Sequence, residues 1–177
     1  MGINDIVLIS AGRLDANKNN ETTIRAVAKV SNVKLLLCGD GELKSKLKAL
    51  AESLGVSDRI LFLGNRTDIM DLYQAADIFV LMSFREGLSR SIMEAMASGL
   101  PCIVSRIRGN VDLVQNDING FLCEASDYLE CAENISKLSE QIELRVKFGE
   151  MNLQNIRHYG LSEITQQLKI IYGEQFC

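Results

Sequence analysis

The stretch VKLLLCGDGELKSKLKALAESL, residues 33–54, contains the pattern that decides the fold. Its first six residues are almost all apolar, which is typical of a strand that is buried on both faces. Two glycines then mark a turn, and after it leucines recur at helical spacing while lysines occupy the opposite side. A strand, a glycine turn and an amphipathic helix together make one unit of an α/β domain.

The same unit recurs along the whole chain. We predict strands at residues 6–9, 33–38, 60–63, 78–82, 102–105 and 121–123. We predict helices at 20–30, 42–54 and 67–75, another that stops before Pro101, and about three more from residue 127, with Gly149 and Gly160 as breaks. Because apolar strands need helices on both faces, the pattern predicts a parallel, doubly wound sheet. No linker or repeat divides residues 1–177, so we expect one domain.

Composition excludes several classes of protein. An apolar content of 47 % in 177 residues excludes a disordered chain. Nineteen basic against 23 acidic residues give a net charge of −4, which argues against nucleic acid as the main partner. The N-terminal segment, with Asp5, lacks the positive charge of a secretory signal, and no apolar run is long enough for a membrane span. We therefore expect a cytoplasmic protein.

The cysteines and the single histidine indicate no metal cluster. Five cysteines without a CxxC pair predict neither a zinc site nor a disulfide framework. Cys38 and Cys102 lie in apolar runs and are expected to be buried, and His158 is interpreted as a polar residue of a late helix. No D-x-D motif occurs, so we expect no bound metal.

The loops that follow the first two strands differ in what they indicate. Ligands of open α/β sheets bind beyond the carboxyl ends of the strands. After the first strand, Arg13 and Lys18 lie five residues apart, a spacing that suits a diphosphate but fits a solvated loop somewhat better by itself. After the second strand, residues 39–41 lack the remaining glycine of GxGxxG and the Lys-Ser/Thr of a P-loop, which favours a plain turn.

The loop after the fourth strand contains two carboxylates near a helix start. Gly87 permits close approach of the backbone, and the helix that follows offers free N–H groups to an anion. Glu86 and Glu94 could accept hydrogen bonds from sugar hydroxyls or stabilise positive charge on a sugar carbon. The segment Ser91-Ile-Met-Glu94 fits a helix capping box equally well.

Six segments in a fixed order resemble one family. They are AGRL (11–14) with Lys18, LLLCGDGELKSKL (35–47), RILFLGNRTDI (59–69), LYQAADIFVLMSFREGL (72–88), SIMEAMASGLPCIVS (91–105) and RGNVDLV through NGFL (108–122). Together they resemble the C-terminal, donor-binding domain of retaining glycosyltransferases of family 4, also called glycosyl transferases group 1, which have the two-domain GT-B architecture. The interval between Glu86 and Glu94 fits the E-x7-E motif of that family. The resemblance implies a Rossmann-like fold.

The resemblance also implies a role for each motif residue. Arg13 and Lys18 would hold the diphosphate of a nucleotide-sugar donor, together with backbone groups of residues 87–89. Glu86 would contact the transferred sugar near its reacting carbon as the catalytic residue, and Glu94 would bind the ribose. The remaining assignments are Gly87, Leu88 and Ser89 to phosphate and sugar, and Asn65 and Arg66 to the base.

The implied reaction is transfer of a sugar from a UDP- or GDP-sugar, with retention and without a metal. The acceptor would be a glycan or a polyprenyl-linked saccharide in bacterial capsule, exopolysaccharide or lipopolysaccharide O-antigen synthesis, with peripheral attachment of the full-length enzyme to the inner face of the cell membrane. A nucleotide-sugar epimerase or phosphorylase of the same architecture, or a binding module without catalysis, remains an alternative. Nothing in the chain resembles the N-terminal acceptor domain, so we expect a fragment that binds donor but is inactive alone.

The last helix could pack in two ways. Leu161, Ile164, Leu168 and Ile171 follow helical spacing and could cover either this domain or the missing one. We expect most of them to pack locally.

Overall fold

Six parallel strands form one sheet at the centre of the protein. The computed structural model describes residues 5–173. The strand order is β3-β2-β1-β4-β5-β6, and every pairing is parallel. The strands are β1 (Ile6–Ala11), β2 (Val33–Cys38), β3 (Ile60–Gly64), β4 (Ile78–Leu81), β5 (Cys102–Ser105) and β6 (Gly120–Cys123). All six predicted strands are therefore confirmed.

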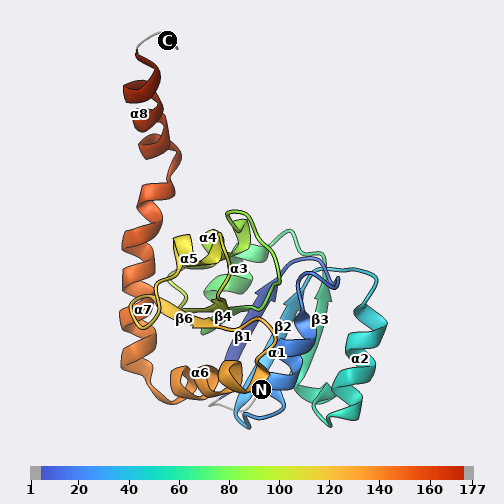
Figure 1. The fold of residues 1–177 in the computed structure, drawn as a ribbon. Helices are drawn as coiled ribbons and strands as arrows, with labels where there is room; N and C mark the ends of the chain where they lie inside the picture. The colour runs from blue at the N-terminus through green and yellow to red at the C-terminus, as the bar shows by residue number, and fades with distance from the viewer. Residues whose placement is uncertain (1–4, 174–177) are drawn as a thin grey trace.

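Helices cover both faces of this sheet (Figure 1). The α-helices are α1 (Asn20–Val27), α2 (Lys44–Ser53), α3 (Ile69–Gln74), α4 (Arg90–Ala97), α5 (Asn110–Leu113), α6 (Tyr128–Glu140), α7 (Ile142–Asn155) and α8 (Leu161–Tyr172). Short 3₁₀ helices occur at η1 (Ser57–Arg59) and η2 (Ile156–Tyr159). The doubly wound, Rossmann-like sheet predicted from the sequence is confirmed.

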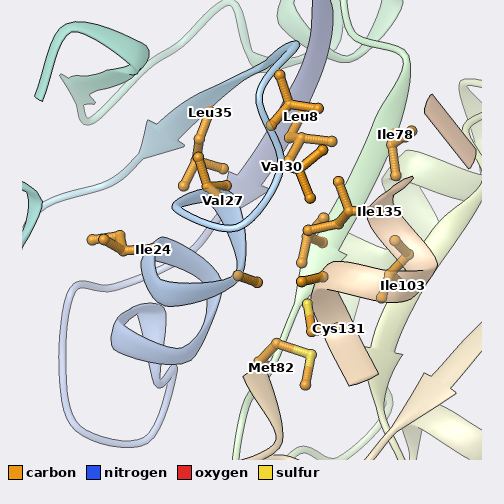
Figure 2. Close-up of a cluster of buried hydrophobic side chains, with 14 of the residues drawn as sticks. Leu8, Ile24, Val27, Val30, Leu35, Ile78, Met82, Ile103, Cys131 and Ile135 are labelled. Atoms are coloured by element: carbon orange, nitrogen blue, oxygen red, sulfur yellow. The ribbon is translucent and has the colours of Figure 1, made fainter. Parts of the chain in front are cut away.

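Alternation along the strands divides the core into two layers. Leu8 belongs to the layer under α1, α2 and α6, whereas its neighbour Ile9 belongs to the layer under α3 and α4. Figure 2 shows part of the first layer, in which Val27 of α1 and Ile135 of α6 lie close to strand residues such as Leu8. Because consecutive strand residues point to opposite faces, an apolar run is what both layers require.

The strand order reverses between β1 and β4. The chain after β1 enters α1 on one face of the sheet, and the chain after β4 enters α4 on the other face. The two loops therefore diverge from neighbouring strands and leave a crevice at the carboxyl edge, which is where open α/β sheets bind ligands. The fold thus directs attention to residues 12–19 and 83–89.

Two details of the C-terminal helices differ from the predictions. Gly160 separates η2 from α8 as predicted, but Gly149 lies inside α7 and does not break it. A side-chain carbon at Gly149 would overlap the carbonyl oxygen of Gly99, in the turn after α4. The glycine is required because α7 approaches that turn closely, so the prediction of a helix break was wrong.

The expectation that α8 packs locally was also wrong. Figure 1 shows α8 projecting away from the sheet. Leu161 is 83 % exposed, and Ile164 and Leu168 are 40 % and 47 % exposed, while the side chain of Ile171 lies outside the described set. Within residues 5–173, no helix combines the length and the hydropathy that crossing a bilayer would require.

Candidate functional site

The loops after β1 and β4 are joined directly across the crevice. The backbone N–H of Phe84 donates to the carbonyl of Asn17 (2.8 Å), and Asn17 Nδ2 donates to the carbonyl of Arg85 (2.9 Å). Beside them, Lys18 Nζ lies 2.6 Å from Glu86 Oε1. Two residues that are 68 positions apart in the sequence are therefore brought together at the point where the strand order reverses.

The Lys18–Glu86 pair is largely shielded from solvent. The side chains are 19 % and 12 % exposed, respectively. The lysine stem lies over Gly12, where a side-chain carbon would come within 3.0 Å of Lys18 Cε, and the backbone N–H of Lys18 donates to Asp15 Oδ1 (3.0 Å). The ammonium is therefore held in one place by its neighbours, as a positioned binding group should be.

A hollow of about 590 Å³ opens beside this pair, over the ends of β1, β2 and β3. It brings together four of the residues singled out from the sequence: Arg13, Asn65, Arg66 and Glu94. The remaining lining residues are Ala11, Gly12, Cys38, Gly39, Asp40, Ile69, Arg90 and Ser91. Lys18, Glu86 and residues 87–89 are not among them, but Gly12 connects Lys18 to the hollow, because it contributes to the lining and carries the lysine stem.

The charged side chains around the hollow differ in how firmly they are held. Arg13 has a side chain that is 69 % exposed, and its Nε lies 3.9 Å from Asp15 Oδ2. Arg66, by contrast, makes two hydrogen bonds to Asp68, of 2.8 and 2.5 Å. Arg13 is thus free to turn toward an anionic ligand, whereas Arg66 would first have to leave a carboxylate.

The carboxylate of Glu94 accepts a hydrogen bond from a buried tyrosine. Tyr73, which is completely buried, places its hydroxyl 3.4 Å from Glu94 Oε2, and Arg90 Nε lies 3.9 Å from Glu94 Oε1. Burial, together with the nearby carboxylate, raises the pKa of Tyr73. The tyrosine therefore remains a hydrogen-bond donor. It was not singled out from the sequence, because the sequence contains no signal that distinguishes it from a core residue.

The capping-box interpretation of Ser91 and Glu94 was wrong. Helix α4 begins at Arg90, with Ser89 preceding it, and Ser89 Oγ lies 3.2 Å from Ser91 Oγ. Glu94 is thus one full turn inside the helix, too far from the N-cap to close a box. Its carboxylate instead faces the hollow.

The Gly87 loop is supported from the loop after β5. A side-chain carbon at Gly109, whose φ is +89°, would overlap the carbonyl oxygen of Gly87 and lie 3.0 Å from that of Glu86. The next residue, Asn110, is completely buried and donates to the carbonyl (3.0 Å) and to the hydroxyl (3.1 Å) of Ser105. Around Gly87 itself nothing lies within 4 Å of an added side-chain carbon, and Leu88 is 49 % exposed.

The turn at residues 39–41 contributes more than the sequence indicated. It joins β2 to α2 as predicted, but side-chain carbons at Gly39 and Gly41 would overlap the carbonyl oxygens of Gly12 and Leu14. Gly39 and Asp40 also line the hollow, next to Cys38, whose pKa is raised by burial to about 11. The sequence signal from which this close approach could have been predicted is the pair of glycines on either side of Asp40.

Residues 5–173 contain neither a disulfide nor a cluster of metal-binding side chains. Cys38 and Cys102 are buried as expected, and neither they nor Cys123 and Cys131 form a disulfide. Cys177 lies outside the described residues. Within residues 5–173, no group of three or more histidine, cysteine, aspartate or glutamate side chains is arranged to hold a metal ion.

A Rossmann-like sheet with charged side chains in its switch-point crevice has the architecture in which open α/β sheets bind small ligands. The model of the family "Glycosyl transferases group 1" matches residues 3–154. The chain therefore belongs to that family, as the resemblance in the sequence implied.

Curated relatives and solved structures agree with this assignment. The chain is 31 % identical over 176 residues to UDP-Gal:alpha-D-GlcNAc-diphosphoundecaprenol alpha-1,3-galactosyltransferase of Escherichia coli, covering 96 % of this chain and 46 % of that protein. It is 35 % identical over 144 residues to the lipopolysaccharide core biosynthesis glycosyltransferase LpsE of Rhizobium meliloti, covering 81 % and 42 %. The chain thus spans about half the length of the curated relatives it matches, and corresponds to their C-terminal half.

Among solved structures, the chain is similar to HepE of Anabaena. The HepE structure in complex with UDP superposes with a TM-score of 0.91 at 27 % identity, covering 96 % of this chain and 49 % of that one. HepE has also been solved with UDP-glucose, and that structure gives a TM-score of 0.89. The matching structures are GT-B glycosyltransferases, so the GT-B assignment of the fold is confirmed.

Proposed function

We propose that this chain is the donor-binding half of a glycosyltransferase and that its crevice holds the diphosphate of a nucleotide sugar. The observation that carries the proposal is the meeting of Lys18 with Glu86 across the switch point, beside a hollow lined by Arg13 and Glu94. Its volume of about 590 Å³ suits a ligand of nucleotide size. HepE, which is similar over 96 % of this chain, binds UDP and UDP-glucose.

In this proposal the crevice favours departure of the nucleotide. As the bond between the sugar and the diphosphate lengthens, negative charge gathers on the diphosphate and positive charge on the sugar carbon. Lys18, Arg13 and the N–H groups of residues 87–89 would stabilise the first charge, and Glu86 would stabilise the second. Glu94 would accept a hydrogen bond from the ribose, with Asn65 and Arg66 beside the base.

The remaining parts of the proposed reaction concern the whole enzyme. We propose retention of the anomeric configuration, no requirement for a metal, and a glycan or polyprenyl-linked acceptor in surface-polysaccharide synthesis. The names of the Escherichia coli and Rhizobium meliloti relatives, a diphosphoundecaprenol galactosyltransferase and a lipopolysaccharide core glycosyltransferase, support this choice of acceptor. The acceptor site would belong to the half of those relatives that this chain does not span, so we expect the 177-residue chain by itself to bind donor without transferring sugar.

Calorimetric titration of the chain with UDP, GDP and their glucose esters tests the proposal. We expect binding of at least one nucleotide, and each of Arg13→Ala and Lys18→Ala should weaken it by about 1.5–3 kcal/mol because each removes one charge-assisted hydrogen bond. Lys29→Ala is the matched control, since this exposed lysine follows α1 near the opposite, amino-terminal edge of the sheet. Absence of binding at millimolar nucleotide, or equal affinity in all three variants, would refute the proposed site.

A further inference from the structure

Glu86 is an unexpected neighbour for a phosphate-binding lysine. Its carboxylate oxygen lies 2.6 Å from Lys18 Nζ, and both side chains are more than 80 % shielded from solvent. The positive charge of Lys18 is therefore already paired with a carboxylate. Arg13, whose side chain is 69 % exposed, is left as the less firmly paired cation of the β1 loop.

The pair places a strict limit on where a bound phosphate can lie. A phosphate oxygen that accepts a hydrogen bond from Lys18 Nζ lies about 2.8 Å from that nitrogen. It must then lie within about 5.5 Å of Glu86 Oε1, because Nζ itself is 2.6 Å from this oxygen. Any phosphate held by Lys18 thus also feels the negative charge of Glu86 at short range.

From this geometry we infer that Glu86 helps the site to distinguish two kinds of ligand: a free nucleoside diphosphate, and a nucleoside diphosphate whose terminal phosphate is esterified. The negative charge of Glu86 lowers the affinity for the free diphosphate relative to the ester. The inference rests on the proposed function, since it takes Lys18 to be a diphosphate ligand. At about pH 8 a free terminal phosphate carries about one negative charge more than its ester, because the second pKa of a phosphate is about 6.

The cations and the carboxylate act on this additional charge in opposite directions. Lys18, Arg13 and the backbone N–H groups of residues 87–89 alone would favour the free diphosphate, which is the product of transfer. Glu86 repels the same charge and shifts the balance toward the ester, which is the substrate class. At a separation of about 5.5 Å, Coulomb's law gives a shift of about tenfold when the effective permittivity lies between those of a protein surface and of water.

The loops around the pair keep Glu86 close to the phosphate position. The Phe84 N–H bond to Asn17 and the Asn17 Nδ2 bond to Arg85 lock the β1 and β4 loops together immediately before Lys18 and Glu86. Asn19 Nδ2 adds a bond of 3.0 Å to the carbonyl of Met82. Because the loops cannot separate without losing these bonds, Glu86 and Lys18 stay close together when Lys18 donates to a ligand.

The test measures a ratio of two affinities in the wild-type chain and in Glu86→Gln. The ligands are UDP and its methyl ester on the terminal phosphate, titrated calorimetrically at about pH 8, with GDP and its methyl ester in parallel. The methyl ester carries the charge of a nucleotide sugar but offers no sugar hydroxyls. Glutamine retains a side-chain oxygen for Lys18 while removing the negative charge.

We expect Glu86→Gln to raise the preference for the free diphosphate over the methyl ester about tenfold relative to the wild-type chain. Glu52→Gln is the control, because it removes the same charge from an exposed side chain near the end of α2, outside the lining of the hollow, and should leave the ratio near its wild-type value. A ratio that is unchanged in Glu86→Gln, or changed equally in both variants, overturns the inference while the proposed function stands. Failure of both ligands to bind the wild-type chain overturns the proposed function, and the inference with it.

Discussion

Replacement of Gly109 by alanine is expected to disturb the candidate site from outside it. Gly109 has a φ of +89°, and its added side-chain carbon would overlap the carbonyl oxygen of Gly87 and lie 2.7 Å from the carbonyl carbon. These are backbone atoms, so no flexible side chain can move aside. The loop that contains Glu86 and Gly87 must shift, or the loop after β5 must open.

The expected cost has two contributions. A non-glycine residue in this backbone conformation costs about 1–2 kcal/mol, and overpacking against fixed atoms adds about 1–3 kcal/mol. We therefore expect Gly109→Ala to lower the free energy of unfolding by about 2–5 kcal/mol, which for a domain of this size corresponds to a fall in Tm of roughly 4–20 °C. Because the displaced loop carries the backbone N–H groups of residues 87–89, which are proposed to meet the diphosphate, nucleotide affinity should fall as well.

Gly55→Ala is the matched control for this experiment. Gly55 also has a positive φ, +68°, but nothing lies within 4 Å of an added side-chain carbon. It should cost about 1 kcal/mol and leave nucleotide affinity unchanged. Thermal unfolding and calorimetric titration of both variants decide the matter: if Gly109→Ala is no less stable than Gly55→Ala and binds UDP as the wild type does, contact between the two loops does not shape the site.

Two further predictions concern Gly87 and Cys38. An added side-chain carbon at Gly87 meets no protein atom within 4 Å, so Gly87→Ala should leave Tm unchanged but weaken UDP binding by blocking close approach of the ligand to the backbone. Unchanged affinity in calorimetry would show that no ligand approaches this backbone. Burial raises the pKa of Cys38 to about 11, so above the ordinary thiol pKa the unfolded chain loses a proton that the folded chain retains. The free energy of unfolding should therefore fall by up to about 1.4 kcal/mol per pH unit between about pH 9 and pH 11. When this free energy is measured by urea titration at several pH values, it should fall less steeply with pH in Cys38→Ala than in the wild-type chain.

The sequence predicted the sheet well because the signal there is local. An apolar run such as Val33–Cys38 reports burial on both faces, and all six runs became strands. Long-range contacts have no such signal. Lys18 and Glu86, 68 residues apart, meet because β1 and β4 are neighbours in the sheet. Gly149 was interpreted as a helix break because the Gly99 carbonyl that it accommodates is distant in the sequence.

The sequence predicted which residues form the candidate site, but not how their side chains contact one another. Sequence reasoning selected Arg13, Lys18, Glu86 and Glu94 because parallel strands deliver their loops to one edge. It could not foresee that Glu86 would neutralise Lys18 at 2.6 Å, since spacing along the chain says nothing of side-chain direction across a crevice. It also missed Tyr73 beneath Glu94, because a buried aromatic residue of a helix satisfies the core and the site at once.

The glycines at the carboxyl edge explain how loops from four strands make one rigid surface. Gly39 and Gly41 contact the backbone of residues 12–14, and Gly109 contacts that of Gly87, each at a distance that excludes a side chain. The loops after β2 and β5 therefore press on those after β1 and β4, which carry the charged residues. Since a ligand need not order loops that are already packed, more of its interaction energy is available for binding. These glycines are therefore expected to affect ligand affinity as well as folding.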